Sequence, residues 1–305
     1  MGHSSHHHDH SWGHGKKAKI IFSIILNFII TGVQLVGGVF SGSLSLISDA
    51  LHNFSDAFAL VTSYIAIRLS EQESTAEKTF GYKRAEIMAA LFNAAILILA
   101  SFALFRNALE RLISPQPDSI NSSLMILVAS IGFLANTSSV LLLRKDAHDN
   151  INMRSAYVHL FTDALTSLAV IAGGILIYFY HIYWIDPVLS IAIGIYVIKE
   201  GYSILSTAIS ILMQHTPEHI DVLKIQQIIE EIDGVKNIHH VHIWQLTEET
   251  IHFEAHINVS KDMLISESCL LKDQIEMILK DKFEITHVIL QLEYDYCKNI
   301  PLINK

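Results

Sequence analysis

Long uncharged stretches recur along the first 212 residues of the chain. Asp, Glu, Lys, Arg and His are all missing from residues 20–48, 87–105 and 119–143. A helix of about 18 or more mostly apolar residues can cross the ~30 Å hydrocarbon core of a membrane. The pattern predicts six membrane-spanning helices, at residues 18–40, 44–68, 85–109, 119–143, 152–180 and 187–210.

The pattern changes after about residue 213, where charged and apolar residues are mixed as in a soluble domain. Apolar positions there recur first at helical spacing and then in the alternation of strands. The predicted elements, in the order αββαβ, are a helix at 218–232, strands at 235–246 and 250–259, a helix at 262–282 and a strand at 285–292. We therefore expect a disordered His-rich tail at 1–17, an all-α six-span transmembrane domain at 18–212 and a small α+β cytoplasmic domain at 213–305.

Basic residues are unevenly distributed over the connections between the predicted spans. Lys and Arg occur at 16–19, 68–84 and 144–154, and both are absent from the connections at 41–43 and 181–186. Arg106 and Arg111, at the outer end of the third span, are outnumbered. Because basic residues are retained on the cytoplasmic side, both termini and the two basic loops are predicted to be cytoplasmic. Short loops and no recognisable targeting segment favour a multi-pass protein of a bacterial plasma or inner membrane, with an organelle membrane as the alternative.

Composition narrows the classes of function. Only 17% of residues are charged, against about a quarter in a typical soluble domain, and 51% are hydrophobic. The net charge is −9 and no basic cluster is longer than Lys16-Lys17, which argues against nucleic-acid binding. Six of the 18 histidines fall in the first 14 residues. They predict a tail that attracts metal ions, with a purification tag as the alternative.

Two predicted spans contain the same polar pair. His52 and Asp56 lie four residues apart in the second span, as do His159 and Asp163 in the fifth. Residues at this spacing share a helix face, so each helix presents an imidazole and a carboxylate on one side. Ionisable side chains are costly at membrane depth and usually mark a functional site. The alternative is a structural polar cluster in which His52 hydrogen-bonds Asp163.

The second and fifth spans are predicted to run in opposite directions, so the two pairs can face each other. Two nitrogen and two oxygen atoms would then meet close to a tetrahedron. This ligand set suits Zn²⁺, whereas Mg²⁺ and Ca²⁺ prefer more oxygens and Cu⁺ prefers sulfur; Cd²⁺ and Co²⁺ are poorly distinguished. Asp49, one turn before His52, is predicted either to guide the departing ion or to hydrogen-bond a neighbouring helix.

Four segments resemble the cation diffusion facilitator family of zinc transporters: SDALHNFSD at 48–56, FGYKRAE at 80–86, AYVHLFTDALTS at 156–167 and VHIW at 241–244. The similarity runs from about residue 16 to residue 297. It implies a homodimer that exports Zn²⁺ by proton antiport. Rocking of helices around a site near the membrane midplane is expected to give alternating access. Cd²⁺ and Co²⁺ are further candidate substrates, because ligand type alone separates these metals poorly. The implied transport site consists of His52, Asp56, His159 and Asp163, and the implied cytoplasmic domain has a metallochaperone-like fold.

The resemblance also implies regulatory zinc in the cytoplasmic domain. The positions that match such sites are His239, His256 and Glu293, with His287 and Cys297 as further candidates. The alternative is that these histidines are ordinary surface residues of an acidic domain.

Two other functions compete with transport. An intramembrane zinc hydrolase would need an open coordination position and a general base, and the chain has no HExxH motif. A zinc sensor could use the tail and the soluble domain without moving the ion. The expectation is a transporter and not an enzyme, with Zn²⁺, protons, the lipid bilayer and a second copy of the chain as its partners.

Overall fold

The computed structural model describes residues 14–114, 120–143, 151–295 and 301–303. Two candidates from the sequence, the tail before residue 14 and Cys297, lie outside the described residues. The chain forms two compact units. One comprises the residues up to Val61 together with Phe92–Ser203, and the other comprises Thr62–Leu91 together with the chain from Ile204 onward.

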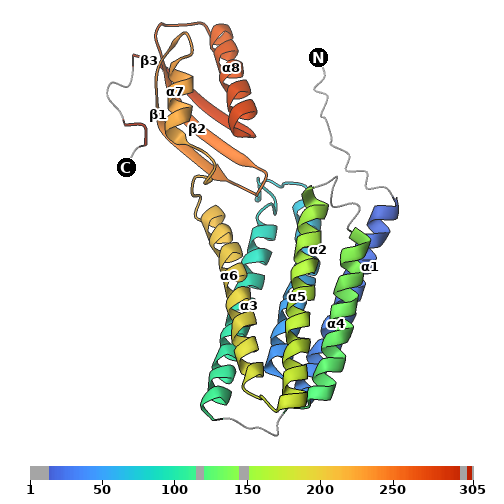
Figure 1. Cartoon of the computed structure of the whole chain (residues 1–305). Coiled ribbons are helices and arrows are strands. Elements are labelled where there is room, and N and C mark those ends of the chain that lie inside the picture. Colours follow the sequence, from blue (N-terminus) through green and yellow to red (C-terminus); the bar gives the residue numbers. More distant parts are fainter. Residues whose placement is uncertain (1–13, 115–119, 144–150, 296–300, 304–305) are drawn as a thin grey trace. The chain divides into compact units, whose positions relative to one another are not determined.

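The predicted fold class is confirmed, because six long helices precede a small domain with a three-stranded sheet (Figure 1). The six helices are α1 His14–Ser41, α2 Leu44–Ser70, α3 Ala85–Ile113, α4 Ser122–Leu143, α5 Ile151–Tyr180 and α6 Ile185–Leu212. The later elements are α7 Val222–Glu230, β1 Val235–Gln245, β2 Ile251–Val259, α8 Ile265–Phe283 and β3 His287–Tyr294.

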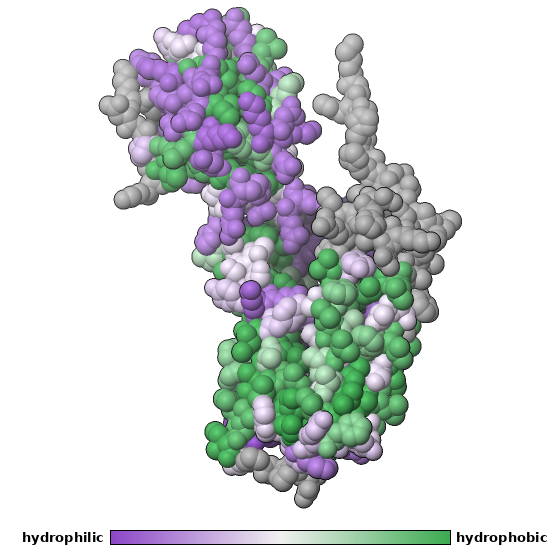
Figure 2. Space-filling view, viewed as in Figure 1, coloured by the Kyte–Doolittle hydropathy of each residue, from purple (hydrophilic) through white to green (hydrophobic). Residues whose placement is uncertain are grey.

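Four helical segments are long and apolar enough to cross a membrane, among the residues that the structure describes: 85–113, 122–141, 157–180 and 185–212. Helix α1 adds a shorter apolar stretch, Phe28–Ser41. Large apolar side chains point outward from these helices, including Leu99, which is 70% exposed, and Leu134, which is 63% exposed. Figure 2 shows a hydrophobic surface over the helices. Such a surface is unfavourable in water and suits a lipid environment.

A buried carboxylate fixes the turn between α1 and α2 in the first unit. Asp186, in the first turn of α6, accepts hydrogen bonds from the hydroxyl groups of Ser43 and Ser45, both at 2.6 Å. It also accepts from the backbone N–H groups of Leu44 at 2.8 Å and Ser45 at 3.1 Å. These N–H groups belong to the first turn of α2 and have no partner within that helix. Arg111 of α3 adds a positive charge 3.9 Å from the same carboxylate.

Small residues allow close helix packing in the first unit. A Cβ atom at Gly37 of α1 would lie 2.6 Å from a methyl group of Val128 on α4. One at Gly174 of α5 would lie 2.7 Å from Ile126 on α4. Close approach of backbones at glycine is typical of membrane helices, where van der Waals contact drives association. This packing fixes the positions of α1, α4 and α5.

The second unit contains the sheet, in the order β1-β2-β3. Strands β1 and β2 pair antiparallel, and β3 pairs parallel to β2 after the crossover through α8. Phe253 and Ile257 of β2 and Ile275 of α8 are fully buried and form the centre of the hydrophobic core. Helix α7 begins at Asp221, whose side chain accepts hydrogen bonds from the first free N–H groups of the helix.

One histidine of this sheet lies in an aromatic cluster. His252 is 6% exposed, and its ring stacks on Trp244 at 5.2 Å between centroids and 18° between planes. Phe80, from the connection between α2 and α3, meets His252 edge-on at 6.0 Å. The ring of His287, its neighbour on β3, lies 4.6 Å away. His252 therefore lies among aromatic and imidazole rings.

Acid is expected to destabilise the protein partly through His252. Burial, with the nearby charges of His287, Lys83 and Arg84, lowers the pKa of His252. The unfolded chain, with a His pKa of about 6.5, then binds more protons as the pH falls, so folded-state stability is lost below that value. Between about pH 7 and pH 5, the melting temperature of the full-length protein in detergent should fall less for His252→Phe than for the parent. Equal slopes would contradict this, and His219→Gln, at an exposed position, is the control.

Candidate metal centre

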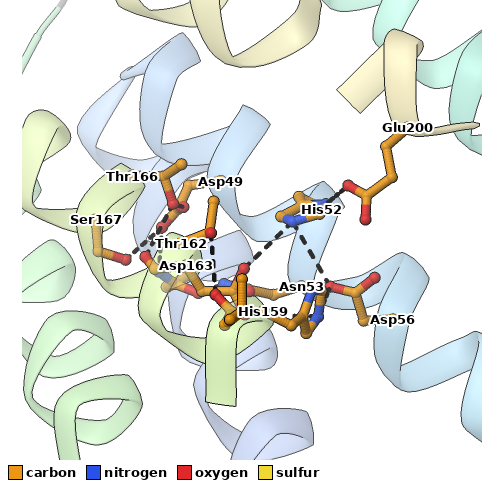
Figure 3. Close-up of polar contacts among 12 residues, drawn as sticks. Asp49, His52, Asn53, Asp56, His159, Thr162, Asp163, Thr166, Ser167 and Glu200 are labelled. Carbon is orange, nitrogen blue, oxygen red and sulfur yellow. Dashed lines mark hydrogen bonds and ion pairs between the residues drawn. The ribbon is translucent and has the colours of Figure 1, made fainter. Parts of the chain in front are cut away.

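Helices α2 and α5 bring four ionisable side chains together in the first unit. His52 and Asp56 come from α2, and His159 and Asp163 come from α5 (Figure 3). The Nε2 atom of His52 lies 3.3 Å from Asp163 Oδ1 and 3.8 Å from Asp56 Oδ2. The Nε2 atom of His159 lies 3.3 Å from Asp56 Oδ2 and 3.7 Å from Asp163 Oδ2. One ligand atom of each residue lies within 4.8 Å of the other three.

These spacings match the ligands of one small ion. In a tetrahedral zinc site with bonds of about 2.0–2.1 Å, neighbouring ligand atoms lie about 3.4 Å apart. Several of the atoms that face the centre are buried without a hydrogen bond of good geometry, including His52 Nε2, Asp56 Oδ2 and both oxygens of Asp163. Buried polar atoms almost always have a partner. The arrangement therefore favours a cation site over the alternative of a purely structural polar cluster.

Asp49 belongs to a separate hydrogen-bond network. Its buried carboxylate accepts from Gln34 Nε2 of α1 at 2.6 Å, and from Thr166 Oγ1 at 2.8 Å and Ser167 Oγ at 2.9 Å on α5. Asn53 of α2 donates to Gln34 Oε1 at 2.8 Å. Of the two roles expected for Asp49, the structure shows hydrogen bonding to neighbouring helices. The network joins α1, α2 and α5 beside the four-residue cluster.

Two side chains of α6 that contact His52 were missed by the sequence analysis. The ring of Tyr196 meets that of His52 edge-on, with centroids 5.7 Å apart and planes at 80°. Glu200 Oε2 lies 4.0 Å from His52 Nδ1 (Figure 3). An acidic residue within a predicted span is itself a signal of function. Glu200 was overlooked because it has no histidine at helical spacing, unlike the two His–Asp pairs.

The three histidine and glutamate candidates of the cytoplasmic domain also lie together, in the second unit. Antiparallel pairing of β1 and β2 places His239 directly opposite His256, and Glu293 lies on the adjacent β3. Glu293 Oε1 lies 2.8 Å from His256 Nδ1, and its Oε2 lies 3.4 Å from His239 Nε2. One ligand atom of each residue lies within 4.8 Å of the other two. Three such ligands suit a zinc ion with one further ligand.

The environment of His239 is compatible with metal binding. Burial lowers the pKa of His239, against the opposing charge of Glu293. A neutral imidazole is the form that binds a metal. His239 Nδ1 lies 3.1 Å from Asn237 Oδ1, which orients Nε2 toward Glu293. His287, the further candidate from the sequence, lies outside this group of three.

Comparison with known proteins identifies the family. Residues 20–213 match the family described as the cation efflux transmembrane domain, and residues 217–295 match the cation efflux protein cytoplasmic domain. The cadmium, cobalt and zinc/H(+)-K(+) antiporter of Bacillus subtilis is 38% identical over 289 residues, which cover 94% of this chain and 91% of that protein. The zinc transporter ZitB of Escherichia coli is 30% identical over 304 residues, covering 96% and 94%.

The metal cation efflux system protein CzcD of Cupriavidus metallidurans is 34% identical over 295 residues, which cover 97% of this chain and 92% of that protein. A solved metal-bound C-terminal domain of the CzcD transporter from that organism covers 24% of this chain and 99% of its own, at 31% identity and a TM-score of 0.22. The family matches together span nearly the whole chain. The chain therefore belongs to the cation efflux family, the cation diffusion facilitators, and is a membrane metal transporter and not an enzyme.

Proposed function

We propose that this protein exports Zn²⁺ from the cytoplasm in exchange for protons, and that His52, Asp56, His159 and Asp163 hold the ion in transit. The observation that carries the proposal is the convergence of four ligand atoms, one from each residue, to within 4.8 Å of one another. Two imidazoles and two carboxylates at tetrahedral spacing are a typical zinc set. Cd²⁺ and Co²⁺ fit the same donors, and both metals appear in the names of the Bacillus relatives.

Proton exchange follows from the chemistry of the ligands. Zinc binds neutral imidazole and ionised carboxylate, so protons and zinc compete for the same atoms. A site that opens to the cytoplasm loads zinc, and one that opens to a more acidic exterior releases it as the ligands take up protons. Movement of helices around a central site would open it to each side of the membrane in turn, and this would couple zinc export to proton uptake.

The location that we propose is a bacterial plasma or inner membrane, with both termini in the cytoplasm. The parts of the protein are the His-rich tail at 1–17, the six-span domain at 18–212 and a cytoplasmic domain at 213–305. A second copy of the chain completes a homodimer, which agrees with the family match of the cytoplasmic domain.

Transport into proteoliposomes tests the proposal. Purified full-length protein is reconstituted, a pH gradient is imposed, and the initial uptake of Zn²⁺, Cd²⁺, Co²⁺ and Mn²⁺ is measured. We expect zinc uptake that depends on the gradient, and little uptake of Mn²⁺, which prefers oxygen ligands. A parallel series with a K⁺ gradient distinguishes potassium from proton exchange. Binding of zinc without any flux would contradict the proposal and favour a sensor.

We further propose that His239, His256 and Glu293 bind a regulatory zinc ion. His239→Ala should remove about one bound zinc per chain, because two protein ligands cannot hold the ion tightly. Metal content is measured on the gel-filtered full-length protein by mass spectrometry. His287→Ala is the matched control, since this strand histidine lies outside the group. Unchanged zinc content in His239→Ala would show that the group is not a metal site.

A further inference from the structure

Glu200 of α6 contacts the side of His52 that faces away from the other three ligands. His52 Nε2 faces Asp163 and Asp56, whereas its Nδ1 atom faces Glu200 Oε2 at 4.0 Å (Figure 3). Both Nδ1 and that Oε2 are buried without a hydrogen bond. A nitrogen that can donate and an oxygen that can accept therefore face each other, at a distance about 1 Å longer than a hydrogen bond.

The two ring nitrogens of a neutral imidazole have different roles. When Nε2 binds a metal, the proton is on Nδ1, and metal-binding histidines almost always donate this proton to a carboxylate, a carbonyl or water. Glu200 Oε2 is a carboxylate oxygen on the required side of the ring of His52. A small side-chain rotation brings it to hydrogen-bond distance, and such contacts are often long until the ligand binds.

A neighbouring ring and burial hold the imidazole of His52 in place. Tyr196, one turn before Glu200 on α6, packs its ring edge-on against His52, with centroids 5.7 Å apart. His52 is only 1% exposed, so its ring has little freedom to rotate. Burial and the contact with Tyr196 thus restrict the imidazole whose Nδ1 atom faces Glu200.

A direct role of Glu200 as a fifth metal ligand does not fit this geometry. Its carboxylate approaches Nδ1, so it lies behind the imidazole and not beside the ion that Nε2 would bind. The group of converging ligand atoms accordingly contains His52, Asp56, His159 and Asp163 without Glu200. An acidic side chain inside a membrane helix nevertheless carries a free-energy cost that a function normally explains.

We infer that Glu200 is a positioning residue of the transport site, which accepts the Nδ1–H of His52 and so presents Nε2 to the metal ion. This inference rests on the proposed transport function. It assigns to α6 a part in the site that is otherwise formed by α2 and α5. Loss of such a partner typically weakens metal binding by about 10–100-fold.

Zinc affinity of full-length variants tests the inference. Affinity is measured by competition with a fluorescent chelator, in a His239→Ala background that removes the proposed cytoplasmic site. Glu200→Leu should weaken zinc binding by about 10–100-fold. Glu200→Gln keeps an oxygen that accepts the Nδ1–H and should retain most of the affinity. Glu110→Gln on α3 is the control, because this carboxylate is 60% exposed and pairs with Arg106 away from the site.

A second comparison shows whether Glu200 acts through His52. In a His52→Gln background, Glu200→Leu should cause no further loss of affinity. Glu200→Ala replaces Glu200→Leu if leucine prevents folding, and melting temperatures identify folded variants. Parent-like zinc affinity in Glu200→Leu, or equal losses in the Leu and Gln variants, would overturn the positioning role and leave the proposed function intact. Failure of the parent protein to bind or move zinc would instead overturn the proposed function.

Discussion

Replacing Asp163 by alanine is expected to abolish zinc transport while the protein remains folded. Asp163 is 1% exposed, and its two oxygens lie 3.3 Å from His52 Nε2 and 3.7 Å from His159 Nε2. The substitution removes one of the four proposed ligands and half of their negative charge. Loss of a residue that only hydrogen-bonds a metal ligand lowers metal affinity by about 10–100-fold. Loss of a ligand itself should therefore lower the transport rate by at least ~100-fold. The measurement is initial zinc uptake into proteoliposomes under a pH gradient.

The neighbouring Thr162 provides the control for Asp163→Ala. Its hydroxyl donates to the backbone of its own helix, at Val158, and is not among the converging ligand atoms. Thr162→Ala should therefore transport zinc at close to the parent rate. Rapid uptake by Asp163→Ala, at a similar level of reconstituted protein, would show that the four-residue cluster is not the transport site.

The sequence pattern was sufficient to predict the helices and the sheet. Long, mostly apolar stretches predicted all six long helices, and the change to alternation after residue 213 predicted the three strands. Element ends shifted by a few residues: the helix predicted at 218–232 begins only after the cap at Asp221, as α7 Val222–Glu230. The domain boundaries at residues 17 and 212 remain a prediction. The family match begins at residue 20 and ends at residue 213, whereas the two compact units divide the chain elsewhere, for example at residues 203 and 204.

The candidate site was predictable where helical spacing alone brings residues together. His52 and Asp56 share a face of α2 by the four-residue rule, and so do His159 and Asp163 on α5. The role of Asp49 was not predictable, because it depends on donors from α1 and α5 that are distant in sequence. In strand β1, the register is irregular between His239 and His242, so simple alternation does not place these histidines.

Replacing Asp186 by alanine is expected to destabilise the folded protein severely. Its buried carboxylate accepts four hydrogen bonds from Ser43, Leu44 and Ser45 and lies 3.9 Å from Arg111. Removing it leaves two N–H groups and two hydroxyl groups without this acceptor, and a partly buried cation without its nearby negative charge. Breaking a buried charge pair by removing one partner costs about 3–5 kcal/mol, a large share of a typical stability. The melting temperature and the fraction of monodisperse protein in detergent should both fall sharply.

Comparison of Asp186 with Asp163 distinguishes a structural carboxylate from a functional one. Both are buried, but Asp186 has donors on its two oxygens, whereas both oxygens of Asp163 lack a hydrogen bond of good geometry. We therefore expect Asp186→Ala to lose folded protein, and Asp163→Ala to lose transport with its melting temperature largely retained. Arg106→Ala, at a residue 80% exposed, is the control for stability. Normal melting of Asp186→Ala would show that the α1–α2 turn does not depend on this carboxylate.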